Sequence, residues 1–565
     1  MFYTLVTLVI PDTLMLSSFF NRDPIVRLIR YLLLAVSLAA LSACSSTPPE
    51  HAPKRITILH TNDHHGRFWH NDRDEYGLSA QKTLVDRIRK EVKGEGGSVL
   101  LFSGGDINTG VPASDMQKAE PDFRGMKMIG YDAMALGNHE FDNPPDVLAR
   151  QIEWAGFPVM SANIYRTDTN THAFQPYALF ERQGLKIAVI GLTTEDTKKF
   201  TNSNNTANLE FRDPTEEARR TIDQLKQTEQ PDVILAVTHM GHYENGEHGA
   251  AAPGDVEMAR KLPTGALAMI IGGHSQNPVC MAEENKRQVD YVPGSPCAPD
   301  RQNGTWIVQA HEWGKYVGRA DFIYRNGQFE LERYQLLPVN LNHDVADSEG
   351  HKHRHYYTEQ IEQDPQMLAL LTPYQEHAKA QLAVPVGELD KTLTGERDKV
   401  RFVQTGLAQL VLAGFMEQTH ADVGVFNGGG LRDSLREGVV RTEDILRILP
   451  FSSTVVSVDL TGKELVDYLD KTTSIQPSVG GYAQLRNIKI KPGAKGMGRY
   501  LIKGKPIVAT QKYRLATTSF CANGGDGHPV ITKMPSFYDS GILDSQALLR
   551  YVQKYTPLHA ADFAP

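Results

Sequence analysis

The chain has 565 residues, of which 41% are hydrophobic and 22% are charged, and its formal net charge is −8. Because this length exceeds what one ordinary core holds, two or more domains are expected, with the composition of a soluble globular protein. The sequence contains no block of basic residues, which argues against polymeric nucleic acid as a partner. A monomer is expected by default.

Residues 1–44 have the pattern of an export signal. Three arginines, Arg22, Arg27 and Arg30, precede the apolar stretch 31–40, which is short for a membrane span but suits a signal peptide. Residues 41–44 resemble a bacterial lipobox, so Cys44 is the expected site of lipidation, with a lipid such as palmitate. Residues 45–54 would be a flexible tether, and the serine after Cys44 indicates anchoring to the outer membrane. An ordinary signal peptide with a chance cysteine, and a true start at Met15, stay open as alternatives.

From residue 55 to about 340 the chain alternates predicted strands and helices. Continuous apolar runs separated by helical stretches are typical of strands that are buried on both faces of an α/β sandwich. A helix is predicted over 80–92, and the strands that matter most are 56–59, 98–102, 132–136, 232–237 and 268–271.

Each of these five strands ends in side chains that bind cations. The carboxyl ends of strands in α/β sheets form a common crevice, so these side chains can meet although they are far apart in the sequence. Asp63 and His65 stand two apart, which in extended chain points both to one side. The candidate metal ligands are Asp63, His65, Asp106, Asn138, His239, His274 and Gln276.

This donor set predicts a centre with two divalent ions. Oxygen and imidazole donors without a thiolate suit Zn, Mn, Mg, Co or Fe. Seven donors are too many for one tetrahedral ion, whereas two ions that share Asp106 would use all of them. Glycines at 104, 105, 272 and 273 would let the backbone approach such a centre closely. A histidine taken alone is more often an ordinary core or surface residue than a metal ligand. The prediction of a metal centre therefore rests on the recurrence of cation-binding side chains at the ends of five strands.

The motifs resemble those of one superfamily in their order along the chain. Residues 63–65, 104–106, 137–140, 238–239 and 272–274 follow the signature of the calcineurin-like metallophosphoesterases. The longer stretches 60–66 and 138–142 resemble its bacterial 5′-nucleotidase and UDP-sugar hydrolase branch. The resemblance implies a four-layer α/β-β-α catalytic sandwich over 55–340 and a C-terminal α/β substrate-binding domain over 385–565. One ion would be held by Asp63, His65, Asp106 and Gln276, and the other by Asp106, Asn138, His239 and His274.

The same resemblance assigns catalytic roles to His139 and Asp142. Two divalent ions, of Mg, Mn, Co or Zn, would clamp a phosphate and activate a hydroxide that attacks phosphorus. His139, oriented and kept cationic by Asp142, would stabilise charge on the phosphoryl oxygens. Asp142 could instead, or in addition, cap a helix that begins in residues 143–146.

Export also changes the expectation for the cysteines. Cys280 and Cys297 flank a loop rich in proline and glycine, and an oxidising compartment favours a disulfide between them. Cys521 is then left as a small packed side chain, since no histidine pattern around it indicates activation.

Residues 341–384 are predicted to be a linker that contains a helix over 364–383, with a possible hinge between the domains. The histidines at 351, 353 and 355 resemble a metal-binding tract, but the flanking polar residues favour a solvated segment.

The C-terminal domain contains polar clusters that suit a nucleotide. Arginine forks match phosphate, and two aromatic rings can enclose a planar base. From composition alone, Phe451 and Phe520 would be core residues. The resemblance implies instead that a base binds between them, and that rotation of the C-terminal domain carries the bound substrate to the metals. The candidate substrate-binding residues are Arg397, Arg401, Asn427, Arg432, Phe451, Phe520 and Asp526.

The resulting hypothesis is an exported, lipid-anchored 5′-nucleotidase that scavenges nucleotides. Enzyme alternatives are a UDP-sugar or nucleoside di- or triphosphate hydrolase and a 2′,3′-cyclic phosphodiesterase. An alternative of another class is a nucleotide-binding surface lipoprotein without activity.

Overall fold

The computed structural model describes residues 53–201, 205–243, 252–451, 453–494 and 496–565, without the side chains of residues 199 and 200. Lys54–Pro565 forms one compact unit. The predicted signal, Cys44 and nearly all of the tether lie outside the described residues. Within the described ranges, no helix is both long enough and apolar enough to cross a membrane.

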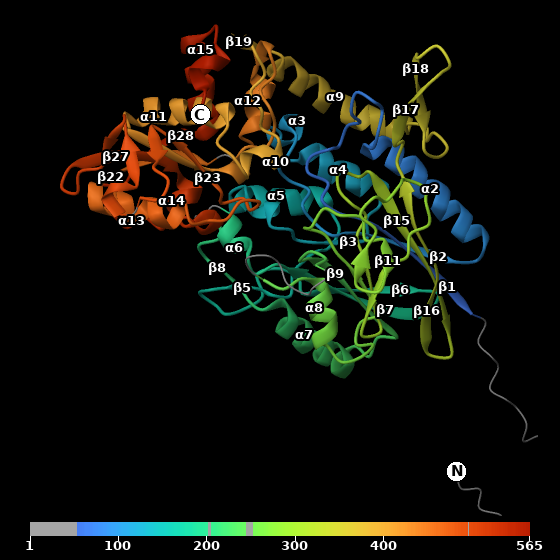
Figure 1. Cartoon of the computed structure of the whole chain (residues 1–565). Coiled ribbons are helices and arrows are strands. Elements are labelled where there is room, and N and C mark those ends of the chain that lie inside the picture. The colour runs from blue at the N-terminus through green and yellow to red at the C-terminus, as the bar shows by residue number, and fades with distance from the viewer. Residues whose placement is uncertain (1–52, 202–204, 244–251, 452, 495) are drawn as a thin grey trace, which may run out of the picture. The chain divides into compact units, whose positions relative to one another are not determined.

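Two six-stranded sheets form the centre of the region before residue 340 (Figure 1). In each sheet, four neighbouring strands are parallel and the outer pairings are antiparallel. The first sheet has the order β16 (Gln328–Pro338), β15 (Tyr316–Arg325), β1 (Lys54–Thr61), β2 (Ser98–Ser103), β3 (Ala133–Ala135) and β4 (Val159–Met160). The second has the order β13 (Asp300–Gln302), β14 (Thr305–Val308), β10 (Met269–Ile271), β9 (Val233–His239), β7 (Leu185–Thr193) and β6 (Tyr177–Arg182).

The two sheets enclose an apolar layer and carry helices on their outer faces. Alternate residues of a strand point to opposite faces, so Ile58 of β1 joins the layer between the sheets while its neighbour Leu59 joins an outer cluster. The helices on the first sheet are α2 (Leu78–Gly94), α4 (Glu120–Ile129) and α5 (Pro145–Ala155), and those on the second are α7 (Pro214–Thr228) and α8 (Asp255–Lys261). This arrangement confirms the four-layer α/β-β-α sandwich, and the predicted helix and five strands lie where the sequence placed them.

The predicted linker contains its helix and also a hairpin. Asp364 is the N-cap of helix α9 (Pro365–Leu382), and its side chain accepts a hydrogen bond from the backbone N–H of Met367 at 2.8 Å. Met367 and Leu371 of α9 are fully buried against the outer cluster of the first sheet. Before it, β17 (Asn342–Ala346) and β18 (Lys352–Tyr356) pair as an antiparallel hairpin. Residues 351–355 are therefore mostly strand, which the sequence analysis did not predict.

The chain after α9 has apolar clusters of its own on both faces of a mixed sheet. The strand order is β23 (Ala483–Arg486), β20 (Val423–Asn427), β27 (Lys512–Thr518), β22 (Thr454–Thr461) and β28 (Tyr538–Leu543). Helices α11 (Gly406–Thr419) and α15 (Asp544–Tyr555) cover one face, and α13 (Gly462–Thr472) covers the other. The structure thus confirms a second α/β region after the helical linker.

Shorter elements complete the described chain. They are α3 (Pro112–Asp115), β5 (Ile164–Arg166), α6 (Thr197–Phe200), β8 (Leu209–Phe211), β11 (Met281–Glu283), β12 (Lys286–Arg287), β19 (Pro385–Leu389), α10 (Arg397–Val400), β21 (Gly438–Arg441), α12 (Thr442–Ile448), β24 (Ile488–Ile490), β25 (Tyr500–Ile502), β26 (Lys505–Pro506) and α14 (Ser519–Ala522), with short 3-10 turns between them.

Candidate metal centre and substrate cavity

The candidate metal ligands converge at the carboxyl ends of the central strands of both sheets. Asp63 and His65 follow β1, Asp106 follows β2 and Asn138 follows β3. His239 ends β9, and His274 and Gln276 follow β10. Their meeting point is the crevice that strand topology predicts.

Five of these residues have left-handed backbone conformations. The φ angles are 51° at Asp63, 51° at His65, 56° at Asp106, 79° at His274 and 55° at Gln276. Residues other than glycine rarely adopt positive φ, and such strain gathers at functional sites that the surrounding fold holds in place. The expectation of an extended chain at Asp63 and His65 is therefore wrong, because a tight turn, and not strand alternation, brings these two side chains together.

Glycines allow the loops of the two sheets to meet behind the ligands. A Cβ atom on Gly104 would lie 2.6 Å from the carbonyl oxygen of Gly272, and one on Gly273 would lie 2.6 Å from that of Gly104. No real side chain tolerates such distances, so this contact requires glycine on both loops. It fixes Asp106 and His274, which follow these glycines, against each other.

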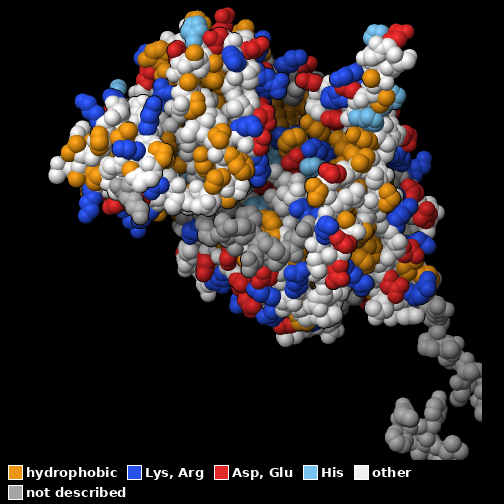
Figure 2. All heavy atoms as spheres, viewed as in Figure 1, with side chains coloured by type: hydrophobic (Ala, Val, Ile, Leu, Met, Phe, Trp, Pro, Cys, Tyr) orange, Lys and Arg blue, Asp and Glu red, His pale blue; other side chains and the backbone are white. Residues whose placement is uncertain are grey.

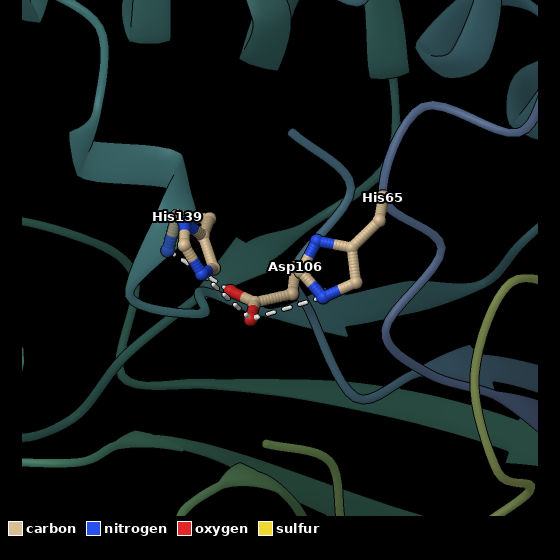
Figure 3. Close-up of side chains that lie close together, drawn as sticks. All are labelled: His65, Asp106 and His139. Atoms are coloured by element: carbon tan, nitrogen blue, oxygen red, sulfur yellow. Dashed lines mark hydrogen bonds and ion pairs between the residues drawn. The ribbon is translucent and has the colours of Figure 1, made fainter. Parts of the chain in front are cut away.

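Asp106 lies at the centre of the cluster. Its Oδ2 atom lies 3.0 Å from His239 Nε2, 3.8 Å from His65 Nε2 and 4.0 Å from His139 Nε2. Figure 3 shows His65 and His139 on either side of this carboxylate. In the described part of the chain, two groups of donors are close enough to hold an ion, and both contain Asp106: one adds His65 and His139, the other His239 and His274. The shared carboxylate suits a bridge between two ions.

Backbone carbonyls orient the two buried histidines toward Asp106. His239 Nδ1 lies 2.6 Å from the carbonyl oxygen of Gly104, and His65 Nδ1 lies 2.8 Å from that of Thr109. A carbonyl oxygen accepts only, so each Nδ1 carries a proton, and in the neutral imidazole Nε2 is the atom left to bind a metal ion. This second contact is how proteins fix the tautomer of a metal-binding histidine.

The remaining donors also fit a cation. The side-chain amide of Gln276 lies 2.7 Å from His65 Nε2, and the buried Oδ1 of Asn138 has no hydrogen-bond partner among the described residues. Burial and the nearby Asp106 carboxylate raise the pKa of Asp63 to about 7. Two buried carboxylates beside an unsatisfied amide oxygen are costly without a cation between them. The side chains therefore fit divalent ions.

His139 and Asp142 form a tight pair next to this centre. His139 Nδ1 lies 2.6 Å from Asp142 Oδ2, which also accepts a hydrogen bond from the Thr109 hydroxyl at 2.7 Å. Burial would lower the pKa of His139, but the carboxylates of Asp142 and Asp106 outweigh it and raise the pKa to about 9. The alternative of Asp142 as a helix cap is wrong, because Pro144 is the N-cap of α5 and the helix has no side-chain cap.

Glu140 has a structural role that the sequence analysis missed. Its buried carboxylate accepts hydrogen bonds from the backbone N–H groups of Gly137, Asp106 and Ile107 at 2.6, 3.0 and 2.8 Å. It thereby ties the loop that carries Asp106 to the turn that carries Asn138. Its place inside the ligand motif was visible in the sequence, but its burial and its partners were not.

One cavity of about 1190 Å³ joins this centre to the C-terminal region. Both predicted catalytic residues and all seven predicted substrate-binding residues line it. Of the predicted metal ligands, Asp106, Asn138, His274 and Gln276 line the cavity, while Asp63, His65 and His239 lie buried behind them. Tyr243, Arg287 and Asp544 also line it and were not predicted.

Three arginines line the part of the cavity that the C-terminal region forms. Burial and the charges of Arg397 and Arg432 lower the pKa of Arg401 to about 10, and burial and Arg397 lower that of Arg432. Arg397 belongs to the one-turn helix α10 and Arg401 follows it, so these arginines lie close together without sharing a longer helix. An anion between the guanidinium groups would relieve their repulsion.

Aromatic and amide groups complete the lining. The Phe451 ring stacks on the His139 ring with centroids 5.8 Å apart, and the Arg432 guanidinium lies 5.1 Å from the centroid of Phe451. Asn427 donates a hydrogen bond to Asp526 at 2.7 Å. The residues predicted to hold a base therefore reach the residues predicted to act on phosphate.

The cysteines agree with their predictions. Cys280 and Cys297 form a disulfide that closes the loop containing β11 and β12. Cys521 is a buried free thiol, and burial raises its pKa to about 11, so it is a packed side chain and not a nucleophile.

The sandwich and its Asp106-centred donor cluster define a metallophosphoesterase. Residues 56–278 match the calcineurin-like phosphoesterase family, and residues 385–533 match the C-terminal domain of 5′-nucleotidases. With relatives of that kind aligned over nearly its whole length, the chain belongs to the 5′-nucleotidase family of metal-dependent phosphoester hydrolases.

Three similar proteins illustrate this membership. Protein UshA of Yersinia enterocolitica is 56% identical over 532 residues, which cover 94% of this chain and 97% of UshA. A 5′-nucleotidase of Vibrio cholerae is 49% identical over 542 residues, which cover 95% of this chain and 98% of the relative. The crystal structure of a 5′-nucleotidase precursor from Thermus thermophilus has 26% identity and a TM-score of 0.67, covering 88% of this chain and 96% of that one.

Proposed function

We propose that this chain is an exported 5′-nucleotidase that hydrolyses the phosphate ester of nucleoside 5′-phosphates. The observation that carries the proposal is that one cavity brings the Asp106 cluster together with the predicted arginines (397, 401 and 432) and the predicted phenylalanines (451 and 520). The Asp106 cluster and the arginines suit a phosphate, and the phenylalanine rings suit a nucleobase. Family membership and the 49% identity to a 5′-nucleotidase support the same substrate class.

Two divalent ions, of Mg, Mn, Co or Zn, would be held by the seven candidate ligands, with Asp106 shared between them. When bound, they would supply Lewis-acid stabilisation of the phosphate and lower the pKa of water at the site. The protein's own part is to fix the donors: Gly104 and Thr109 orient the imidazoles, and Glu140 holds the two ligand loops together.

The remaining residues would bind and polarise the substrate. His139 stays protonated beside Asp142 and would donate a hydrogen bond to a phosphoryl oxygen as negative charge develops there. Arg397, Arg401 and Arg432 would neutralise phosphate, while Phe451 and Phe520 would enclose the base. Asn427 and Asp526 already pair with each other and would contact the base or ribose.

A larger nucleotide is the second candidate substrate. The cavity of about 1190 Å³ exceeds the usual range of roughly 300–1,000 Å³ for ligand sites, which leaves room for a diphosphate or a UDP-sugar. A 2′,3′-cyclic phosphate would use the same phosphorus centre. The inactive surface lipoprotein is disfavoured, because a binding protein has no need of a buried two-ion donor set.

We also propose that residues 1–44 direct export and that Cys44 anchors the protein to the outer membrane as a monomer. Support for export and anchoring comes from the sequence of this segment alone, and the monomer is a default assumption. The division into a catalytic domain (55–340), a linker (341–384) and a substrate domain (385–565) is supported by the separate apolar clusters before and after α9.

The test is phosphate release by protein that lacks residues 1–44. AMP, ATP and UDP-glucose are supplied before and after chelation, and Mg, Mn, Co or Zn is then restored. We expect hydrolysis that stops on chelation and returns with metal, with AMP as the best substrate. A preference for UDP-glucose would favour the larger-nucleotide alternative, and no release with any metal would favour a binding protein. Mass spectrometry of the full chain for a lipid on Cys44 tests the anchor separately.

A further inference from the structure

One buried carboxyl group of the C-terminal region has no role in the proposed mechanism. Among the described residues after α9, Asp544 is the only Asp or Glu that is buried, with 2% of its surface exposed. On the face that Figure 2 shows, Asp and Glu side chains lie at the surface, intermingled with those of Lys and Arg. Asp544 has no ion-pair partner within the described ranges, and burial raises its pKa to about 8.

The strand topology places Asp544 beside the two phenylalanines. Strand β22 is antiparallel to both of its neighbours, so the start of β22 and the ends of β27 and β28 share one edge of the sheet. Phe451 precedes β22, Phe520 follows β27 and Asp544 follows β28. All three line the cavity. The rings that are proposed to enclose the base therefore have a carboxyl group beside them.

Hydrogen bonds of the main chain fix this arrangement. The backbone N–H of Asp544 donates to the carbonyl oxygen of Ser453 at 2.8 Å. The backbone N–H of Thr454 donates to the hydroxyl of Ser519 at 3.0 Å. Because these groups belong to the segments that carry the two rings, the rings and Asp544 are held in one rigid edge of the sheet.

The two oxygens of the Asp544 carboxyl group have different surroundings. Oδ1 accepts a hydrogen bond from the backbone N–H of Ser545 at 2.7 Å, and none of the described residues donates to Oδ2. At pH 7 the group is mostly neutral, and the oxygen that already accepts an N–H is the less favourable place for the proton. Oδ2 therefore offers an O–H donor to a ligand in the cavity.

We propose that Asp544 anchors the base of the nucleotide by donating a hydrogen bond from Oδ2 to an acceptor atom on the edge of the base. This inference rests on the proposed function, since it takes the base to lie between Phe451 and Phe520. Purines and pyrimidines both carry ring nitrogens or carbonyl oxygens that accept, so the anchor would serve either. Stacking leaves a base free to turn in its own plane, and a hydrogen bond at one edge fixes it.

The position of Asp544 at a helix end offers a purely structural explanation. Asp544 is the first residue of α15, and an acidic residue in the first turn stabilises a helix through the helix dipole. That role needs no contact with a ligand. Loss of the side chain would then affect stability and every substrate equally, whereas loss of an anchor affects only substrates whose base carries an acceptor.

The test compares KM for two substrates at pH 7, using protein that lacks residues 1–44 and has its metal restored. The substrates are AMP and an analogue with benzene in place of adenine, which keeps the phosphate, the ribose and an aromatic ring but has no acceptor. Asp544→Ala removes the donor. Asp544→Asn keeps one, because Nδ2 replaces Oδ2 while Oδ1 still accepts the N–H of Ser545. The control is Asp467→Ala, at an exposed position of α13.

We expect Asp544→Ala to raise KM for AMP by about 2- to 13-fold, the effect of losing one hydrogen bond, with kcat unchanged. KM for the analogue should not change, and Asp544→Asn and Asp467→Ala should keep the wild-type values for both substrates. An unchanged KM for AMP, or an equal rise for both substrates, would overturn the proposal. If Asp544→Ala does not fold, Asp544→Ser replaces it, because the serine hydroxyl can accept the N–H of Ser545 but is shorter than the carboxyl group and does not reach the base.

The same assay separates this inference from the proposed function. Phosphate release from AMP by the wild type tests the proposed function directly. If the wild type hydrolyses AMP and Asp544→Ala has the same KM, only the anchor is wrong. If the wild type releases no phosphate from AMP with any metal, both the proposed function and the anchor are wrong.

Discussion

His139 has the contacts of a side chain that stabilises developing negative charge. It lies 4.0 Å from the Asp106 carboxylate and is held by Asp142 at 2.6 Å. Removing one such donor typically costs about 100- to 1,000-fold in kcat. We therefore expect His139→Ala to lower kcat for AMP by that factor with little change in bound metal, measured by phosphate release and metal analysis. His377→Ala, an exposed position of α9, is the control, and an undiminished rate in His139→Ala would contradict the role given to His139.

The charge of Asp142 should determine the alkaline limit of activity. Because Asp142 raises the pKa of His139, the imidazole stays cationic up to about pH 9, and activity should fall as the pH rises through that value. Asp142→Asn removes this contribution, so the pKa of His139 falls and the alkaline limb should move to lower pH. Rate–pH profiles of wild type and variant measure the shift. Asp146→Asn, on the exposed part of α5, should leave the profile unchanged.

Glu140 should control metal content without touching a substrate. A glutamine at this position would place an N–H₂ group among backbone N–H donors and loosen the loops of Asp106 and Asn138. Replacing a residue that holds metal ligands in place typically lowers metal affinity by about 10- to 100-fold. Glu140→Gln should therefore lose metal at chelator concentrations that the wild type resists. Glu153→Gln, at an exposed position of α5, should not, and equal retention by both variants would contradict the role of Glu140.

The residue types of the metal centre could be predicted from sequence, but their geometry could not. Strand ends rich in Asp, His and Asn indicate a common crevice by topology alone. The left-handed backbone at Asp63 and His65 depends on long-range contacts, such as the Asp63 N–H to the Gly105 carbonyl at 2.9 Å. No local pattern in the sequence encodes that bond. The role of Glu140 was missed for the same reason, because its donors Asp106 and Ile107 lie more than 30 residues away in the sequence.

At the scale of elements, five of the buried parallel strands were predicted, whereas the buried parallel strand β7 and the antiparallel strands were missed. Five apolar runs gave β1, β2, β3, β9 and β10, because strands covered on both faces are continuously hydrophobic. In the hairpin of β15 and β16, β15 is buried over most of its length, β16 alternates over part of its length, and the turn is Asn326-Gly327, where both φ angles are positive. This pair is a strong hairpin signal that the sequence analysis did not use.

The disulfide of Cys280 and Cys297 should stabilise the loop that carries β11 and β12. A sequence separation of 17 corresponds to about 3 kcal/mol of unfolding free energy in the chain-entropy estimate. Replacing both cysteines with serine should lower the free energy of unfolding by about that amount, measured by urea denaturation. Reducing agent should destabilise the wild type and leave the double variant unchanged. If both proteins respond alike to the reductant, the stabilisation does not come from this bond.

At the scale of the whole described unit, the two regions meet at the cavity. Phe451 from the C-terminal region stacks on His139 from the sandwich, and Leu446 of α12 packs against the outer cluster of the first sheet. Local sequence carries no information about this meeting, since it depends on the surfaces of two separately folded regions. Only the resemblance to a family predicted that substrate residues and metal ligands would share one site.

Enclosure of the substrate between two regions predicts that turnover requires them to separate. Helices α3 and α12 are in contact across this boundary, and neither contributes to the cavity lining. A disulfide engineered between them at a pair with suitable Cβ spacing should hold the regions together. The oxidised variant should complete no more than one turnover for each enzyme molecule, and a reductant should restore steady-state phosphate release. Wild type with the same reductant corrects for loss of the native disulfide, and each single cysteine corrects for the substitutions. Equal steady-state rates in the oxidised and reduced variant would show that substrate enters and product leaves without movement at this boundary, and the cavity would then have to open through its own loops.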